Sequence, residues 1–98
     1  MSSLGIGTEA NWQALCVGRC GIRRVTRFDV SAFACQIAGE IEGFDPLNYI
    51  DKKDVKKMDT FIQYAVAAAD FAMESANFKI TPDVAPRVGV FIASGIGG

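Results

Sequence analysis

Histidine is absent from this 98-residue sequence, which restricts the chemistry that its residues can perform. Ser/His/Asp and Cys/His arrangements, in which histidine activates the nucleophile, cannot be assembled within the segment. The carboxylates, among them Glu40, Glu42, Asp45 and Asp59, lack the spacing of an acid/base pair and are expected to be surface or capping residues. The sequence therefore predicts no catalytic residue in this segment.

Cysteine is also scarce, with three residues at Cys16, Cys20 and Cys35. An odd number of cysteines without CxxC spacing, and without histidine to complete a ligand set, fits neither a zinc site nor a redox pair. We therefore expect three reduced, structural thiols and no metal site.

Long apolar runs and a strong net charge are missing too. No run approaches the ~20 apolar residues of a membrane span, and residues 1–8 lack the charged and apolar regions of a signal peptide. The formal net charge of −1 gives no general attraction to nucleic acid or to anionic membranes. We expect a cytoplasmic protein that binds neither, and any electrostatic partner must be recognised by a local patch.

Apolar residues, in contrast, make up half of the sequence, which is typical of a packed interior or a large interface. With 98 residues the chain can hold at most one domain. Val88 to Ala93 is a short apolar run with the pattern of a strand covered on both faces in a parallel sheet. The other candidate strand is Ala32 to Ile41, whose residues alternate. These two strands predict an incomplete sheet, and so a portion of a larger protein.

The first helix is predicted at Glu9 to Val17, with Thr8 as its N-cap and an end near Gly18. The residues that this helix is expected to bury are Trp12, Leu15 and Cys16. Arg19 to Ser31 has little periodicity and predicts an irregular connection to the first strand.

The strongest helix is predicted at Asp59 to Ala76, which is rich in alanine and contains neither glycine nor proline. Its apolar residues cover most of the circumference, so other elements must bury it on nearly all sides. The chain supplies too few such elements. A membrane helix is disfavoured by the charged residues Asp59, Asp70 and Glu74.

A group of lysines precedes this helix. Asp51 is a candidate cap for a short helix in which Lys53, Lys56 and Lys57 share one face at spacing i, i+3 and i+4. Such a cluster is either a solvated helix face or a docking site for an acidic partner.

Two glycine motifs, Gly5-Ile6-Gly7 and Gly95-Ile96-Gly97-Gly98, suggest a phosphate-binding loop at first sight. The first lacks a preceding strand and the second lacks a following helix, so neither satisfies the context of a dinucleotide fingerprint. Tight turns are the favoured interpretation.

The order of these segments resembles the N-terminal part of the β-ketoacyl-acyl carrier protein synthases of the type II class. The resemblance begins at SLG of residues 3–5 and covers essentially the whole chain. Its most specific pieces are Phe28-Asp29, Lys57-Met58-Asp59, Gln63-Tyr64 and Ser94-Gly95-Ile96-Gly97-Gly98.

The resemblance implies an α/β fold, the N-terminal part of a thiolase-like α/β/α/β/α arrangement, with residues 1–98 as a single partial domain. It implies an acyltransferase that elongates fatty acyl chains by decarboxylating Claisen condensation, without a metal or organic cofactor. The complete enzyme would be a homodimer that takes acyl- and malonyl-loaded carrier protein. The family's first strand, nucleophilic cysteine and catalytic histidines correspond to no residue here, so the chain alone is expected to be inactive.

Two site roles follow from the resemblance, residue by residue. Lys53, Lys56 and Lys57 match basic positions that dock the acidic carrier protein, and Ile96 matches a position at the acyl-chain pocket near the dimer interface. Packing of the turn is the alternative for Ile96. The alternatives for the whole chain are a fragment of a polyketide ketosynthase, or a short non-catalytic protein that binds a carrier protein or pairs with a synthase.

Overall fold

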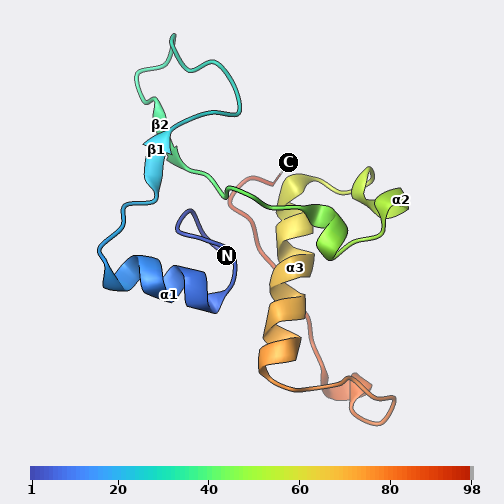
Figure 1. The fold of residues 1–98 in the computed structure, drawn as a ribbon. Coiled ribbons are helices and arrows are strands. Elements are labelled where there is room, and N and C mark those ends of the chain that lie inside the picture. The colour runs from blue at the N-terminus through green and yellow to red at the C-terminus, as the bar shows by residue number, and fades with distance from the viewer. Residues whose placement is uncertain (98) are drawn as a thin grey trace. The chain divides into compact units, whose positions relative to one another are not determined.

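The computed structural model describes residues 1–97, which form two compact units, Met1–Phe44 and a second that begins at Asp45 (Figure 1). The first unit contains helix α1 (Thr8–Cys16) and strands β1 (Ile22–Arg24) and β2 (Ile37–Gly39). The second unit contains the 3-10 helices η1 (Pro46–Asn48) and η2 (Ala85–Arg87) and the helices α2 (Lys52–Val55) and α3 (Thr60–Ser75).

Helix α1 confirms the helix predicted at Glu9 to Val17, with each end displaced by one residue. Its C-terminus is a Schellman motif, because the Gly18 amide donates to the Leu15 carbonyl at 3.0 Å and the Arg19 amide to the Ala14 carbonyl at 2.9 Å. Gly18 has φ 66°, a left-handed conformation that glycine adopts without steric cost. The predicted end near Gly18 is therefore confirmed.

The N-terminus of α1 differs from the prediction. Gly7 occupies the N-cap position, so Thr8 is the first helical residue and the predicted Thr8 cap is wrong. The side-chain amide of Asn11 instead donates to the carbonyls of Gly5 at 2.8 Å and Gly7 at 2.7 Å. Gly5 also exchanges two backbone hydrogen bonds with Ser2, which confirms the tight turn predicted for this glycine motif.

Burial in α1 is also different from the expectation. Trp12 is 60% exposed, Leu15 is 58% exposed and Cys16 is exposed, whereas Ala14 is buried. A unit of this size has little surface with which to cover large side chains. The expected burial of Trp12, Leu15 and Cys16 is therefore wrong.

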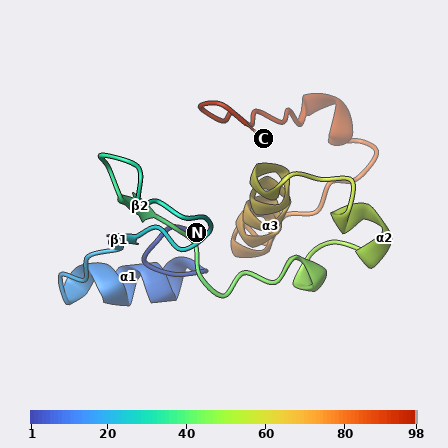
Figure 2. The same cartoon turned by 90° about the horizontal axis from the view of Figure 1, so that it is seen from above.

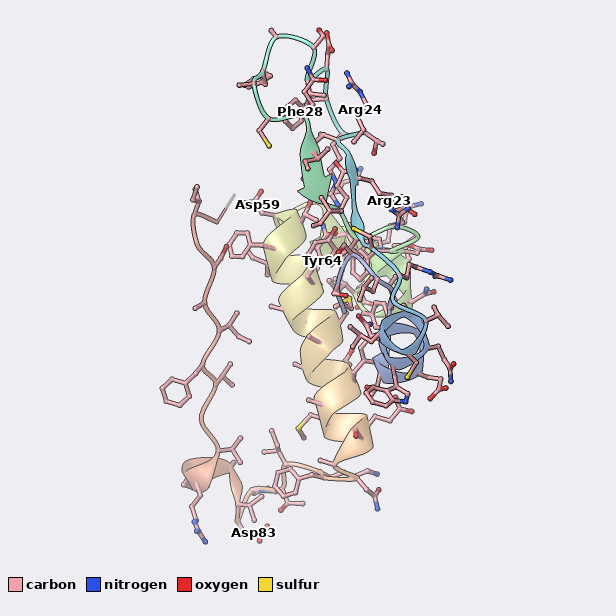
Figure 3. The ribbon with its side chains drawn as sticks, turned by 90° about the vertical axis from the view of Figure 1, so that its left-hand side faces the viewer. Arg23, Arg24, Phe28, Asp59, Tyr64 and Asp83 are labelled. Carbon is pink, nitrogen blue, oxygen red and sulfur yellow. The ribbon has the colours of Figure 1, made fainter. Side chains whose placement is uncertain are left out.

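Strands β1 and β2 form an antiparallel hairpin in which Ile22 lies opposite Gly39 (Figure 3). The strand predicted at Ala32 to Ile41 is wrong for its first half. The irregular connection predicted at Arg19 to Ser31 is wrong as well, since it contains β1.

A loop replaces the first half of that predicted strand. The Phe33 amide donates to the Val30 carbonyl at 3.0 Å, and the Gln36 side-chain amide donates to the Phe33 carbonyl at 3.2 Å. Val30 is buried, and the rings of Phe28 and Phe33 meet edge to face at 5.9 Å. These local contacts hold the backbone in a turn, so it cannot extend the ladder with β1.

Glu40 closes the hairpin by accepting hydrogen bonds from the Thr26 amide at 3.2 Å and the Thr26 hydroxyl at 2.8 Å. The bond from the hydroxyl is the largest cause that holds the pKa of Glu40 below its ordinary value. Because the folded pKa is lower than the unfolded one, ionised Glu40 stabilises the hairpin above the unfolded value, and this contribution is lost as pH falls through the folded pKa.

We therefore expect Thr26→Ala to raise the pKa of Glu40, because the hydroxyl that favours the carboxylate is removed. The measurement is the pH titration of the Glu40 side-chain carboxyl carbon by NMR, with Thr8→Ala as a control outside the hairpin. Equal titration midpoints in the two variants would contradict the prediction.

The second unit is centred on α3. Ala67 of this helix is fully buried, and the rings of Tyr49 and Phe71 meet edge to face at 5.4 Å. Asp45 caps η1 by accepting the Leu47 amide at 3.0 Å. The segment that leads into α2 is thereby fixed against the helix.

Helix α3 confirms the helix predicted at Asp59 to Ala76, and these two residues occupy its N-cap and C-cap positions. Ala67 is its one buried residue among those described, so most of its apolar circumference is only partly covered. This agrees with the expectation that the chain supplies too few elements to bury the helix. Within residues 1–97, no helix has the length and apolarity required to cross a membrane.

The residues after η2 run back along α3, as Figure 1 and Figure 2 show. The strand predicted at Val88 to Ala93 is wrong for this structure, because the described part of the chain offers it no neighbouring strand to complete a ladder. Val90 is 82% exposed and Phe91 is 96% exposed. The prediction that the chain holds only an incomplete sheet is confirmed.

Candidate functional site

Two surfaces of the second unit contain the residues singled out in the sequence. We call residues 51–58 the lysine segment, and the hollow between α3 and the residues after η2 the apolar cleft. Figure 2, seen along α3, shows α2 and the residues after η2 on different sides of the helix.

The lysine segment is shorter as a helix than its spacing suggests. Helix α2 contains Lys53, whereas Lys56 is its C-cap residue and Lys57 lies beyond it. Asp51 occupies the N-cap position but its side chain makes no capping hydrogen bond, so the predicted cap is wrong in its chemistry. The three lysines therefore lie on a helical turn and its exit, and all three are exposed.

Carboxylates of the same segment lie beside two of these lysines. Lys57 Nζ is 3.0 Å from Asp54 Oδ1, and Lys53 Nζ is 3.9 Å from Asp51 Oδ2. In the described part of the chain, Lys56 has no carboxylate within 4.0 Å. Of the three predicted docking lysines, Lys56 thus has no ion pair within the described part of the chain, whereas Lys53 and Lys57 each have one.

Gln63 of α3 fixes the lysine segment in place. Its side-chain amide donates to the Met58 carbonyl at 2.9 Å and to the Val55 carbonyl at 3.3 Å. These carbonyls belong to the exit from α2, where the Val55 carbonyl also accepts the Met58 amide at 3.3 Å. Sequence reasoning missed this positioning role, because it named Gln63 only within the Gln63-Tyr64 piece of the resemblance.

The apolar cleft has a volume of about 290 Å³. Its lining residues are Phe61, Ile62, Ala65, Val66, Ala69, Val90 and Ile92. No charged side chain is among them, so the cleft can accept an aliphatic group without desolvating an ion.

Ile96 lies in a turn in which the Gly97 amide donates to the Ser94 hydroxyl at 3.1 Å. Gly97 has φ 89°, and a Cβ placed on it would lie 3.6 Å from Phe61 Cε1, so the turn adjoins a residue of the apolar cleft. The Ile96 side chain is fully exposed. Gly98, the last residue of the motif, lies outside the described residues.

The three cysteines are free and exposed, so no disulfide joins them in the described part of the chain, and the burial expected for Cys16 is wrong. Cys35 lies in the loop of the hairpin and Cys16 ends α1. Over residues 1–97, no three His, Cys, Asp or Glu side chains gather in a group that could hold a metal ion.

Comparison with known proteins gives consistent matches. A family model described as "Beta-ketoacyl synthase, N-terminal domain" matches residues 1–98. The chain is 46% identical over its whole length to a protein of Coxiella burnetii and 43% identical to one of Vibrio cholerae, both named 3-oxoacyl-[acyl-carrier-protein] synthase 2. It covers 24% of each, so it spans about a quarter of the length of these curated relatives.

A solved structure is similar as well. The chain matches the ishigamide ketosynthase/chain length factor with a TM-score of 0.71 and 38% identity, over 80% of this chain and 19% of that one. The predicted fold class, a partial α/β fold of the ketosynthase type, is confirmed by this match.

Proposed function

Because the chain belongs to the β-ketoacyl synthase family, we propose that it provides the carrier-protein docking surface and part of the acyl pocket of a 3-oxoacyl-[acyl-carrier-protein] synthase. The observation that carries this proposal is the lysine segment, whose ammonium groups are exposed and whose backbone is hydrogen-bonded to Gln63 of α3. The complete protein would be an acyltransferase of fatty acid biosynthesis.

In the proposed reaction, an acyl group passes from the carrier thioester to a cysteine of the enzyme, and the carrier thiol is released. Malonyl-carrier then loses carbon dioxide. The resulting carbanion attacks the acyl-cysteine, which forms the new carbon–carbon bond and releases the cysteine thiol. None of these steps is assigned to residues 1–98, which would bind and orient the substrates.

The proposed partner is an acidic acyl carrier protein, loaded with an acyl or a malonyl group. Exposed ammonium groups on Lys53, Lys56 and Lys57 attract such a partner through complementary charge, at little desolvation cost. The remaining proposals are a homodimer as the assembled form and a cytoplasmic location.

The experiment uses a chimeric synthase in which residues 1–98 replace the aligned segment of the Vibrio cholerae relative. We expect the chimera to elongate acyl-carrier protein. Each exposed charge contact contributes about 0.2–1 kcal/mol, so changing Lys53, Lys56 and Lys57 together to glutamate should raise KM for the carrier about 10- to 50-fold. The effect should shrink as ionic strength rises.

A matched control reverses three exposed charges elsewhere, with Arg19, Lys79 and Arg87 changed together to glutamate. This control has the same net charge as the lysine variant, so it separates docking from overall charge. A folded chimera without elongation activity would refute the proposed function. Equal KM values for the two triple variants at low salt would remove the docking role of the lysines.

A further inference from the structure

Asp54 holds Lys57 within the proposed docking surface. Their 3.0 Å separation is within hydrogen-bonding distance and joins residues three positions apart. The Asp54 side chain is 35% exposed, against 72% for Lys57, so the carboxylate is the more enclosed member of the pair. Asp54 therefore occupies one of the three N–H donors of Lys57 and offsets part of its charge before any acidic partner arrives.

The Lys53–Asp51 pair is looser. Lys53 Nζ and Asp51 Oδ2 are 3.9 Å apart. The side chains are 75% exposed for Lys53 and 78% exposed for Asp51. Water screens such a pair strongly, so Asp51 restrains Lys53 much less than Asp54 restrains Lys57.

We propose that Asp54 limits the affinity of the lysine segment for its acidic partner, by competing with the partner's carboxylates for Lys57. This inference rests on the proposed function, because it assigns a regulating residue to the same docking surface. An acidic partner must share Lys57 with Asp54 or displace that contact, and in both cases it meets the repulsion of the Asp54 charge. Asp54 thereby favours fast release of the carrier protein, which must leave after delivering its acyl group.

The test measures association and dissociation of Vibrio cholerae acyl carrier protein on the immobilised chimeric synthase. Since exposed ion pairs contribute modestly, Asp54→Asn should tighten binding about 2- to 5-fold at low salt, and the difference should decline as salt is added. Asp54→Glu, which keeps the charge, should stay close to the parent. Asp83→Asn is the matched control, because it removes one exposed carboxylate near the other end of α3 (Figure 3).

A double-mutant cycle separates competition from a general change of charge. Lys57→Gln should weaken carrier binding about 2-fold in the parent and about 5-fold in the Asp54→Asn background, where Lys57 is released. Equal effects of Lys57→Gln in both backgrounds would overturn the inference, as would unchanged affinity of Asp54→Asn.

The two proposals fail in different ways. If the parent chimera binds carrier protein and the cycle shows no coupling, the role of Asp54 is refuted and docking stands. If the parent chimera binds no carrier protein at low salt, the docking function is refuted together with this inference.

Discussion

Replacing Ile96 by phenylalanine is expected to lower kcat/KM of the chimeric synthase for dodecanoyl-carrier protein about 100-fold, because a pocket discriminates strongly when a larger side chain excludes a substrate. Activity with the hexanoyl substrate should change much less. The expectation follows from the proposed place of Ile96 at the acyl pocket and from the full exposure of its side chain.

The surroundings of Ile96 explain why a single side chain can have this effect. The turn adjoins Phe61, which lines the apolar cleft, and Gly97 keeps a positive φ that a side chain would strain. A phenyl ring at position 96 therefore enlarges the one side chain in a turn otherwise built from small residues.

The measurement is kcat/KM for hexanoyl- and dodecanoyl-carrier protein with the parent, Ile96→Phe and Ile96→Ala. Ile96→Ala should retain kcat/KM for dodecanoyl-carrier protein, since the smaller side chain leaves more space for the acyl chain. Ile80→Phe is the control, because it makes the same enlargement at an exposed isoleucine elsewhere in the second unit. A uniform loss on both substrates in Ile96→Phe would exclude a role in chain-length selection.

The helices could be predicted from the sequence because their signals are local. Alanine-rich residues without glycine or proline predict α3, and Gly18 predicts the end of α1, where it adopts the left-handed conformation that a Schellman motif requires. Each of these features depends on residues within a turn or two of one another.

The strands could not be predicted because they depend on partners. Strand β1 contains two arginines and has no apolar alternation, and it forms because Ile22 meets Gly39, seventeen positions later. The loop between the strands is held by the Gln36 side chain, which no periodicity reveals. In the residues after η2 the opposite occurs, since an apolar run has strand composition but no ladder partner.

The proposed docking surface could be predicted only in part, because some of its features are local in sequence and others depend on packing. The spacing of Lys53, Lys56 and Lys57 placed them in one short segment, and the structure keeps them there, exposed. The hydrogen bond from Gln63 to the Met58 carbonyl depends on how α3 packs against the exit from α2. The ion pair between Asp54 and Lys57 depends on side-chain geometry. Neither is encoded in spacing alone.

Gly21→Ala is expected to destabilise the first unit by about 3 kcal/mol, the upper part of the usual range for overpacking a closely packed site. Gly21 is buried directly before β1. A Cβ there would lie 2.9 Å from both the carbonyl carbon and the carbonyl oxygen of Ser3, and it would also meet the Ser3 hydroxyl. The Ser3 carbonyl belongs to the backbone and cannot rotate away as a side chain can. The whole turn at Ser2–Gly5 must therefore move away from Gly21 and the hairpin.

Two further glycines provide a graded comparison for this substitution. A Cβ on Gly39 would lie 3.3 Å from Ser3 Cβ, which a small adjustment relieves, so Gly39→Ala should cost about 1 kcal/mol. Gly95 has open space around it, and Gly95→Ala should leave stability near the parent value. Hydrogen–deuterium exchange of peptides from residues 1–24 in the chimeric synthase reports the first unit directly.

Combining Gly21→Ala with Ser3→Gly identifies which Ser3 atoms cause the cost. If the hydroxyl were the main obstacle, deleting the Ser3 side chain would restore the exchange protection. The close approach to the Ser3 carbonyl remains in the double variant, so we expect protection to recover only slightly. Complete recovery would show that the side chain alone opposes the new methyl group, and that the backbone of the N-terminal turn can yield.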